Sequence, residues 1–288
     1  MKPVYAKILE GSEIATFATR EVNRPFFSTE FHFHSACQMT YIVKSEGKRI
    51  IGDNVDRFLK DELTFIGSDL PHVWHNDQIN TPTHNEAKSL ALYIEPALIV
   101  QAFAQFFNTS KLEAFFNLSK RGLIFYGKTK DELKKKLVKI VKLPYGPQKT
   151  ILLIEIIEIL INCAEYESIS STGYTNNYNP IDNNKIERVF KYVFDNYPKE
   201  ILLSDVSDMS SMSKHAFCRY FKSRTQKTFI QFVNEVRISE ACKMIAENSI
   251  QITNIAYECG FNSLSNFNKI FKSVKGITPT EYKSQIFK

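Results

Sequence analysis

The sequence predicts an α+β protein of two domains: a small antiparallel β-barrel or sandwich with helices, followed by an all-α domain. Short β-branched and aromatic runs broken by turn residues fill residues 5–73. The hydrophobic pattern is helical over residues 96–165 and again after residue 184. Between the two parts, residues 168–184 are rich in Ser, Thr, Asn and Gly, a composition typical of a linker. We therefore expect domains at 1–167 and 185–288, joined by a linker at 168–184.

The charge is unevenly divided. Residues 183–288 carry 16 Lys+Arg against 10 Asp+Glu, whereas the first 182 residues carry 21 of each. All the excess positive charge therefore lies in the C-terminal third, as expected for a surface that binds phosphate groups. A basic face turned only to solvent is the alternative that charge alone leaves open.

The cysteines and the hydropathy indicate a compartment. Five cysteines are scattered along the chain without a CxxC pair, which favours reduced thiols over disulfides. The first ten residues lack the apolar stretch of a signal peptide, and polar residues interrupt the most apolar segment, residues 151–163. We expect a cytoplasmic protein with no membrane partner.

An internal repeat is the most informative feature. Residues 213–223 (SKHAFCRYFKS) and 263–273 (SLSNFNKIFKS) match at an offset of 50. In each copy a serine stands where a helix N-cap belongs, and two phenylalanines at i and i+4 face a core. A short amphipathic segment and a turn precede each copy. This is the layout of two tandem helix-turn-helix units; a helical solenoid, the alternative, needs about three or more copies.

Polar and basic residues occupy the opposite face of both repeated helices, where a DNA-reading helix would carry its contacts. In the first copy they are Lys214, His215, Cys218 and Arg219, and in the second Leu264, Ser265, Asn266, Asn268 and Lys269. Arginine and lysine can pair with guanine and asparagine with adenine, although Arg219 and Lys269 could instead contact only phosphate. Residues 229–247 form a connecting helix between the two copies.

This part of the chain resembles the AraC/XylS family of transcriptional regulators. The signature is Ile255-Ala256, Gly260-Phe261, the run SxSNFNKIFK and Gly276 to Pro279 with Tyr282, within a resemblance that covers residues 186–283. The resemblance implies that the nine residues named above contact double-stranded DNA. It also implies a small-molecule effector, and RNA polymerase as a partner if the protein is an activator.

The first unit departs from the family pattern at three positions. Ser207 stands where the family commonly has Ala, and Ser211 and Gln226 where it commonly has Gly. If the backbone needs a positive φ at Gln226, the substitution costs on the order of 1 kcal/mol. We therefore expect the first helix-turn-helix unit to recognise DNA less tightly than the second.

The N-terminal half resembles the family's cupin-like sensor domain over residues 16–76. The resemblance implies a small ligand inside the β-barrel. We expect the effector, with a sugar-like molecule one candidate, to contact His32, His34, Gln38, Tyr41, His72 and Trp74.

The histidines also resemble the metal motif of catalytic cupins. His32 and His34 lie at i and i+2 of one strand and so face the same side, and His72 follows later. Gln38 replaces the usual Glu and lowers the ligand charge. We expect no metal, no cofactor and no catalytic residue. A metal-dependent cupin enzyme with an appended DNA-binding domain and plain structural histidines remain as alternatives.

A helix is expected over residues 150–165, apolar except for one narrow polar stripe. Such a helix must be covered on more than one side. We expect one side to meet the β-barrel and the other a second copy of the chain, forming a homodimer.

Overall fold

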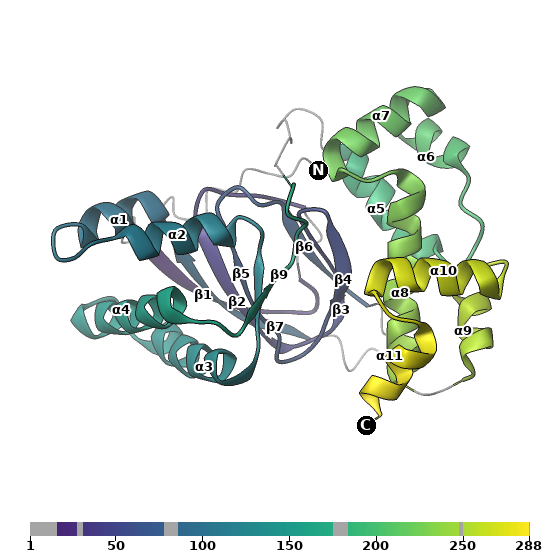
Figure 1. The fold of residues 1–288 in the computed structure, drawn as a ribbon. Coiled ribbons are helices and arrows are strands. Elements are labelled where there is room, and N and C mark those ends of the chain that lie inside the picture. Colours follow the sequence, from purple (N-terminus) through teal and green to yellow (C-terminus); the bar gives the residue numbers. More distant parts are fainter. Residues whose placement is uncertain (1–15, 28–30, 78–85, 175–183, 248–249, 288) are drawn as a thin grey trace. The chain divides into compact units, whose positions relative to one another are not determined.

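The computed structural model describes residues 16–27, 31–77, 86–174, 184–247 and 250–287 (Figure 1). Apart from short segments, the chain divides into a sheet unit up to residue 176 and a helical unit from residue 177 onward. No helix in the described residues is long and apolar enough to cross a membrane.

The sheet unit contains two antiparallel sheets. The larger has the strand order β1-β7-β2-β5-β8-β9 and the smaller β4-β3-β6. The strands are β1 (Phe17–Arg24), β2 (Cys37–Lys44), β3 (Gly47–Ile51), β4 (Asn54–Phe58), β5 (Leu63–Ile66), β6 (His72–Asn76), β7 (Ala87–Ile94), β8 (Leu123–Phe125) and β9 (Tyr166–Ser168). Strands distant in sequence are joined: Phe17 in β1 pairs with Ile94 in β7.

Four helices pack against one face of the larger sheet (Figure 1). They are α1 (Pro96–Phe103), α2 (Ser110–Ser119), α3 (Gly127–Lys142) and α4 (Pro147–Asn162). Strand alternation sends Cys37, Met39 and Tyr41 of β2 into the core with these helices. Ile42 lies in a second cluster with Trp74 of the smaller sheet. The interior between the two sheets is therefore separate from the core under the helices.

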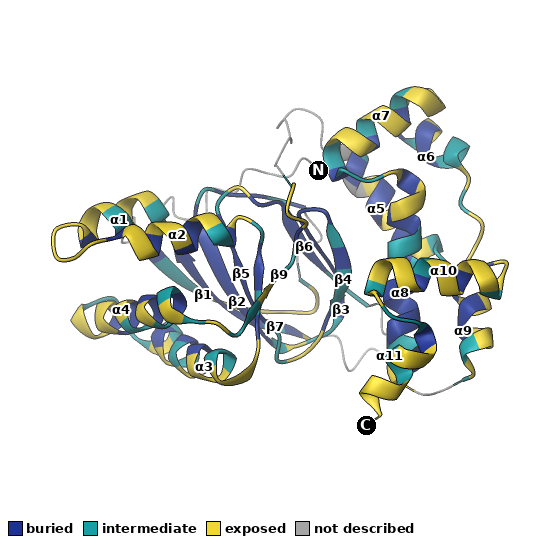
Figure 2. Ribbon diagram, viewed as in Figure 1, coloured by how far each residue is buried: buried dark blue, intermediate teal, exposed yellow. Residues whose placement is uncertain are grey.

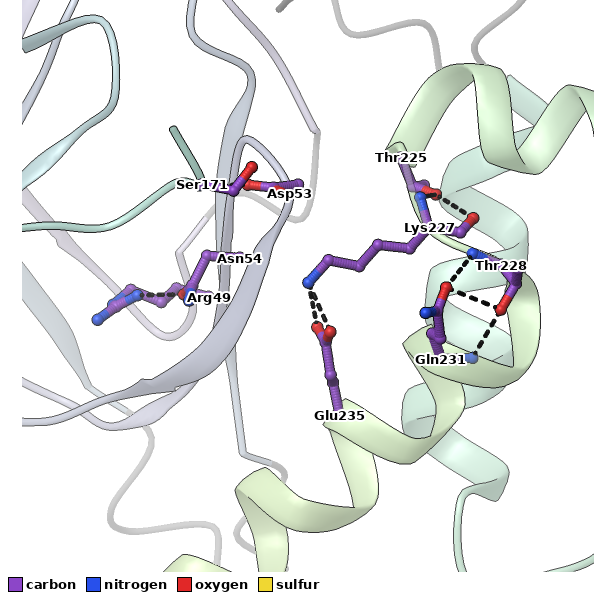
Figure 3. A network of polar contacts seen from close by, with 9 residues as sticks. All are labelled: Arg49, Asp53, Asn54, Ser171, Thr225, Lys227, Thr228, Gln231 and Glu235. Carbon is purple, nitrogen blue, oxygen red and sulfur yellow. Dashed lines mark hydrogen bonds and ion pairs between the residues drawn. The ribbon is translucent and has the colours of Figure 1, made fainter. Parts of the chain in front are cut away.

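The sequence correctly predicted a β-sheet region followed by helices. The closed barrel stays a prediction, because the described strands pair as two separate sheets. The predicted linker begins too early: β9 extends to Ser168, and the buried Ser170 donates from Oγ to the Ile51 carbonyl at 3.1 Å. The Ser171 amide donates to Asp53 at 3.0 Å (Figure 3). Residues 175–183 of that linker lie outside the described residues.

The helical unit is built around one long buried helix. Its elements are α5 (Asn184–Asn196), α6 (Leu203–Met209), α7 (Lys214–Thr225), α8 (Phe229–Ala246), α9 (Ile252–Glu258), α10 (Leu264–Lys275) and α11 (Pro279–Ile286). Most of α8 is buried (Figure 2). Phe229 and Phe232, near its N-terminus, pack against Phe221 of α7. Residues nearer its C-terminus, including Ile238, pack with Phe267 of α10. A single helix thus serves the cores of both repeats.

Local signals fix where these helices begin. Thr228 and Gln231 form a reciprocal capping box at the start of α8 (Figure 3). The same figure shows Lys227 paired with Glu235 one turn further along, with both Nζ–O distances 2.6 Å. These contacts fix the connection between α7 and α8.

Candidate functional site

The two repeated helices present matching faces. Ser213 caps α7 by accepting from the Ala216 amide at 3.3 Å, and Ser263 caps α10 by accepting from the Asn266 amide at 3.4 Å. The N-caps expected from sequence are confirmed. The paired phenylalanines of each helix, among them Phe217 in α7, are fully buried. Burial of that face leaves the opposite face of each helix exposed (Figure 2).

The structure places the sequence-predicted DNA contacts on these exposed faces with one exception. The exposed residues are Lys214, His215, Cys218, Arg219, Ser265, Asn266, Asn268 and Lys269. Leu264 is half-buried and packs against the core of the second unit, so its side chain is less available to a base edge. Four of these exposed residues lie on α7 and four on α10.

A half-buried arginine of α8 connects the two helix-turn-helix units. Arg237 donates from Nε to the Tyr197 carbonyl and from a terminal nitrogen to the Lys199 carbonyl, both at 2.9 Å. Its guanidinium also lies 5.7 Å from the ring centre of Phe261, in the turn before α10. The α5–α6 connection and the second helix-turn-helix turn are therefore held by one side chain. Sequence reasoning missed this residue because its partners are backbone carbonyls.

A histidine cluster lies in the sheet unit. Donor atoms of His32, His34 and His72 all lie within 4.8 Å of one another. Backbone bonds between His32 and His72, at 2.8 and 3.1 Å, join the two segments. Gln38 Oε1 lies 2.9 Å from His34 Nε2 and 3.3 Å from His72 Nε2. Four of the six predicted effector residues are thus brought together.

The backbone fixes the tautomers of two of these rings. Nδ1 of His34 lies 2.6 Å from the Ala36 carbonyl, and Nδ1 of His72 lies 2.8 Å from the Leu70 carbonyl. A carbonyl only accepts, so Nδ1 carries the proton in both rings and each Nε2 of the neutral ring carries a lone pair. Burial, with a smaller contribution from the nearby His32, lowers the pKa of His34 to about 4 and that of His72 well below its usual value. Both rings are therefore neutral at neutral pH.

Trp74 extends the cluster, and Tyr41 does not. The Trp74 ring centre lies 5.5 Å from that of His72. Tyr41 is on the opposite face of β2 from Gln38, and its hydroxyl donates to Asp61 at 3.0 Å. It therefore lies apart from the other predicted effector contacts. The period-2 alternation of a strand already separates positions 38 and 41.

Sequence reasoning missed Tyr174, which it placed in the linker. Tyr174 packs against the apolar cluster that contains Trp74. The Trp74 Nε1 and the Tyr174 hydroxyl are both buried without a hydrogen-bond partner among the described residues. Such groups are costly to bury unpaired, so they mark a place where a polar ligand would be satisfied.

Two linked helix-turn-helix units with exposed polar and basic faces define a DNA-binding protein. Residues 206–285 match the family described as "Helix-turn-helix domain". This match and the relatives below agree with the resemblance of residues 186–283 to the DNA-binding part of AraC/XylS-type transcriptional regulators.

The similar proteins differ in the share of their length that aligns with this chain. The chain is 28% identical over 103 residues to the uncharacterized HTH-type transcriptional regulator YdeC of Bacillus subtilis, covering 36% of this chain and 35% of that protein. It is 20% identical over 254 residues to the HTH-type transcriptional activator RhaR of Escherichia coli K12, covering 88% and 86%. ToxT of Vibrio cholerae is similar at 14% identity and a TM-score of 0.37, covering 93% of this chain and 98% of that one. The last likeness is too distant to inform the fold.

Proposed function

We propose that this protein is a sequence-specific transcriptional regulator that reads DNA with α7 and α10 and responds to a small-molecule effector in its sheet unit. The observation that carries the proposal is the duplicated exposed face, with a basic residue at the same position, Arg219 or Lys269, in each copy. Arginine and lysine at such positions contact guanine edges or phosphates in the major groove.

The shared helix α8 holds the two recognition helices in a fixed arrangement. The 18 residues of α8 span about 27 Å at 1.5 Å per residue, and each end is part of one unit's core. With the offset to each recognition helix, this approaches one duplex turn of about 34 Å. Both helices would then enter successive major-groove segments on the same side of the DNA.

Substitution of one contact in each helix tests this proposal. An operator would first be selected from a random duplex pool with the full chain. Arg219→Ala is expected to weaken binding at one subsite and Lys269→Ala at the other, each by about 1–3 kcal/mol if it contacts a base edge. Lys191→Ala removes an exposed positive charge from α5 and is the matched control. It should weaken binding little, and equally for all sequences.

A spacing change supplies the second arm. Inserting about 5 base pairs, half a turn, between the subsites rotates one of them away from its helix. Affinity is then expected to fall to that of a single unit. Unchanged affinity would show that only one helix reads DNA, which contradicts the proposal.

The effector is proposed to contact His32, His34, Gln38, His72 and Trp74. Support comes from the indole N–H of Trp74, which lies beside the histidines and has no hydrogen-bond partner in the part of the chain that the structure describes. Trp74 is the only tryptophan of the chain, so its fluorescence reports on this place alone. Candidate ligands, sugars included, should change its emission and shift the DNA affinity together. A ligand that shifts DNA affinity without changing the emission would place the effector elsewhere.

A homodimer through α4 completes the proposal. Ile151 and Ile154 are 55% and 43% exposed on α4, while the other side of the helix is buried in the core of the sheet unit. Exposed apolar side chains gathered on one helix favour contact with a second copy. A cytoplasmic location, and contact with RNA polymerase if the protein is an activator, belong to the same proposal.

A further inference from the structure

In place of the expectation that these residues hold no metal, we propose that His32, His34 and His72, together with the amide oxygen of Gln38, bind a divalent first-row transition-metal ion. The inference deepens the proposed function, because the metal would lie where the effector is proposed to bind. Imidazole nitrogens are suited to Zn²⁺, Ni²⁺, Cu²⁺ and Fe²⁺.

The atoms that would bind the metal are all hydrogen-bond acceptors, and they face one another. The Nδ1–H groups of His34 and His72 are used by backbone carbonyls, so both Nε2 atoms point a lone pair toward Gln38 Oε1. Oε1 is also an acceptor, and the amide nitrogen of Gln38 donates away from it to Thr40 Oγ1 at 2.6 Å. Three acceptors at 2.9 and 3.3 Å repel one another unless a cation lies among them. A metal ion satisfies all three at once.

The spacing suits such an ion. With metal–ligand bonds of about 2.1 Å, neighbouring ligands are about 3.0–3.4 Å apart and opposite ligands about 4.2 Å. The distances from Gln38 Oε1 to the two Nε2 atoms match neighbouring ligands, and the three histidine donors lie within 4.8 Å of one another. The 4.8 Å limit exceeds the roughly 4.2 Å between opposite ligands, so the rings would move inward by a few tenths of an ångström to close around a metal.

The surroundings also suit metal ligation. Imidazoles that bind metals almost always donate their other N–H to a carbonyl, a carboxylate or water, which orients the ring. His34 and His72 do so, and at 2% and 0% exposure their orientation is fixed by packing. All the donors are uncharged, so the bound ion would keep its charge and attract an oxygen-bearing effector.

Co²⁺ titration of the full chain, stripped of metal with EDTA, tests the site. Co²⁺ absorbs visible light when ligated and quenches a nearby excited indole, and the ring centre of Trp74 lies 5.5 Å from that of His72. We expect saturable quenching and a visible absorption band at one equivalent. His34→Ala and His72→Ala should abolish both signals. His75→Ala is the matched control, since it lies on the same strand with the opposite alternation, and should leave both signals unchanged.

Gln38→Glu separates a metal site from a polar cluster without metal. An anionic ligand in place of the amide should tighten Co²⁺ binding by roughly tenfold or more, and added metal should raise the unfolding midpoint more than in the unaltered chain. If the Gln38 amide is instead reversed and donates to the rings, no cation is needed. In that case neither effect occurs and the proposal is overturned, as it also is if His72→Ala binds Co²⁺ unchanged.

DNA binding of the same stripped protein keeps the two proposals apart. DNA binding without Co²⁺ uptake would overturn the metal site alone. Co²⁺ uptake by a chain that binds no DNA would support the metal site and overturn the proposed function.

Discussion

The recognition helices end in the same backbone conformation but with different residues. Gln226 follows α7 at φ 58° and ψ 12°, and Gly276 follows α10 at φ 78° and ψ −18°. Each donates its amide to a carbonyl four residues back at 2.9 Å, so both are left-handed C-terminal caps. The positive φ anticipated for position 226 is confirmed. Such a conformation costs an L-residue about 1–2 kcal/mol and glycine almost nothing.

Gln226→Gly is therefore expected to stabilise the helical unit. It removes about 1–2 kcal/mol of strain, while the greater freedom of glycine in the unfolded chain costs about 0.5–1 kcal/mol. The net gain is about 0.5–1 kcal/mol. Gly276→Gln should lose a similar amount, and no steric clash adds to it because nothing lies within 4 Å of a Cβ built at Gly276.

Thermal unfolding of the helical unit, residues 177–288, measures both changes. For a domain of about 100 residues, 1 kcal/mol corresponds to about 4–8 °C in the midpoint. Gln226→Gly should raise the midpoint by a few degrees and Gly276→Gln should lower it. Ser223→Gly, inside α7, is the control. It should lower the free energy of unfolding by about 0.5 kcal/mol, and the midpoint with it. If Gln226→Gly lowered the midpoint as the control does, the strain argument would be wrong.

Three further outcomes are expected. Gly260→Ala should destabilise the helical unit by about 2–4 kcal/mol, because φ is 84° and a Cβ would lie 2.6 Å from the Tyr197 carbonyl oxygen; urea unfolding measures it, and a loss below 1 kcal/mol would contradict it. Arg237→Met should cost about 1.5–3 kcal/mol and weaken binding to a two-subsite duplex more than to a single subsite; equal weakening in a mobility-shift titration would argue against a coupling role. Ile151→Asp with Ile154→Asp should give folded monomers by light scattering; unfolded chains would mean that α4 is only core.

The helical unit could be predicted closely because its signals are local. The connecting helix expected over residues 229–247 is α8, Phe229–Ala246, and both serine caps lie where the repeat places them. Periodicity and capping depend on residues within a few positions of one another. Each can therefore be read from a short window of sequence.

The sheet unit depends on distant partners and was predicted less well. The alternation of β2 is the same in a barrel and in two facing sheets, so it does not specify which strands pair. Residues 168–174 look like a linker by composition, yet Ser170 is buried through a bond to Ile51, more than a hundred residues earlier. Nothing near Tyr174 in the sequence signals that it packs with the Trp74 cluster. The histidines of the candidate site could be found from the sequence because their motif is local. That the Trp74 indole N–H and the Tyr174 hydroxyl are buried without a partner among the described residues could be seen only in the structure.

The burial of α8 explains why the spacing of the two DNA readers should be fixed. A helix with one apolar face can shift along its neighbour, but α8 is buried on several sides and packs with the first unit through Phe229 and Phe232. It packs with the second unit through Ile238 and Ile245. A change in the relative position of α7 and α10 must disrupt one of these cores, at about 2–5 kcal/mol for each large side chain that leaves its place. The proposed effector would therefore act by changing how the whole helical unit engages DNA, and not by changing the distance between its two recognition helices.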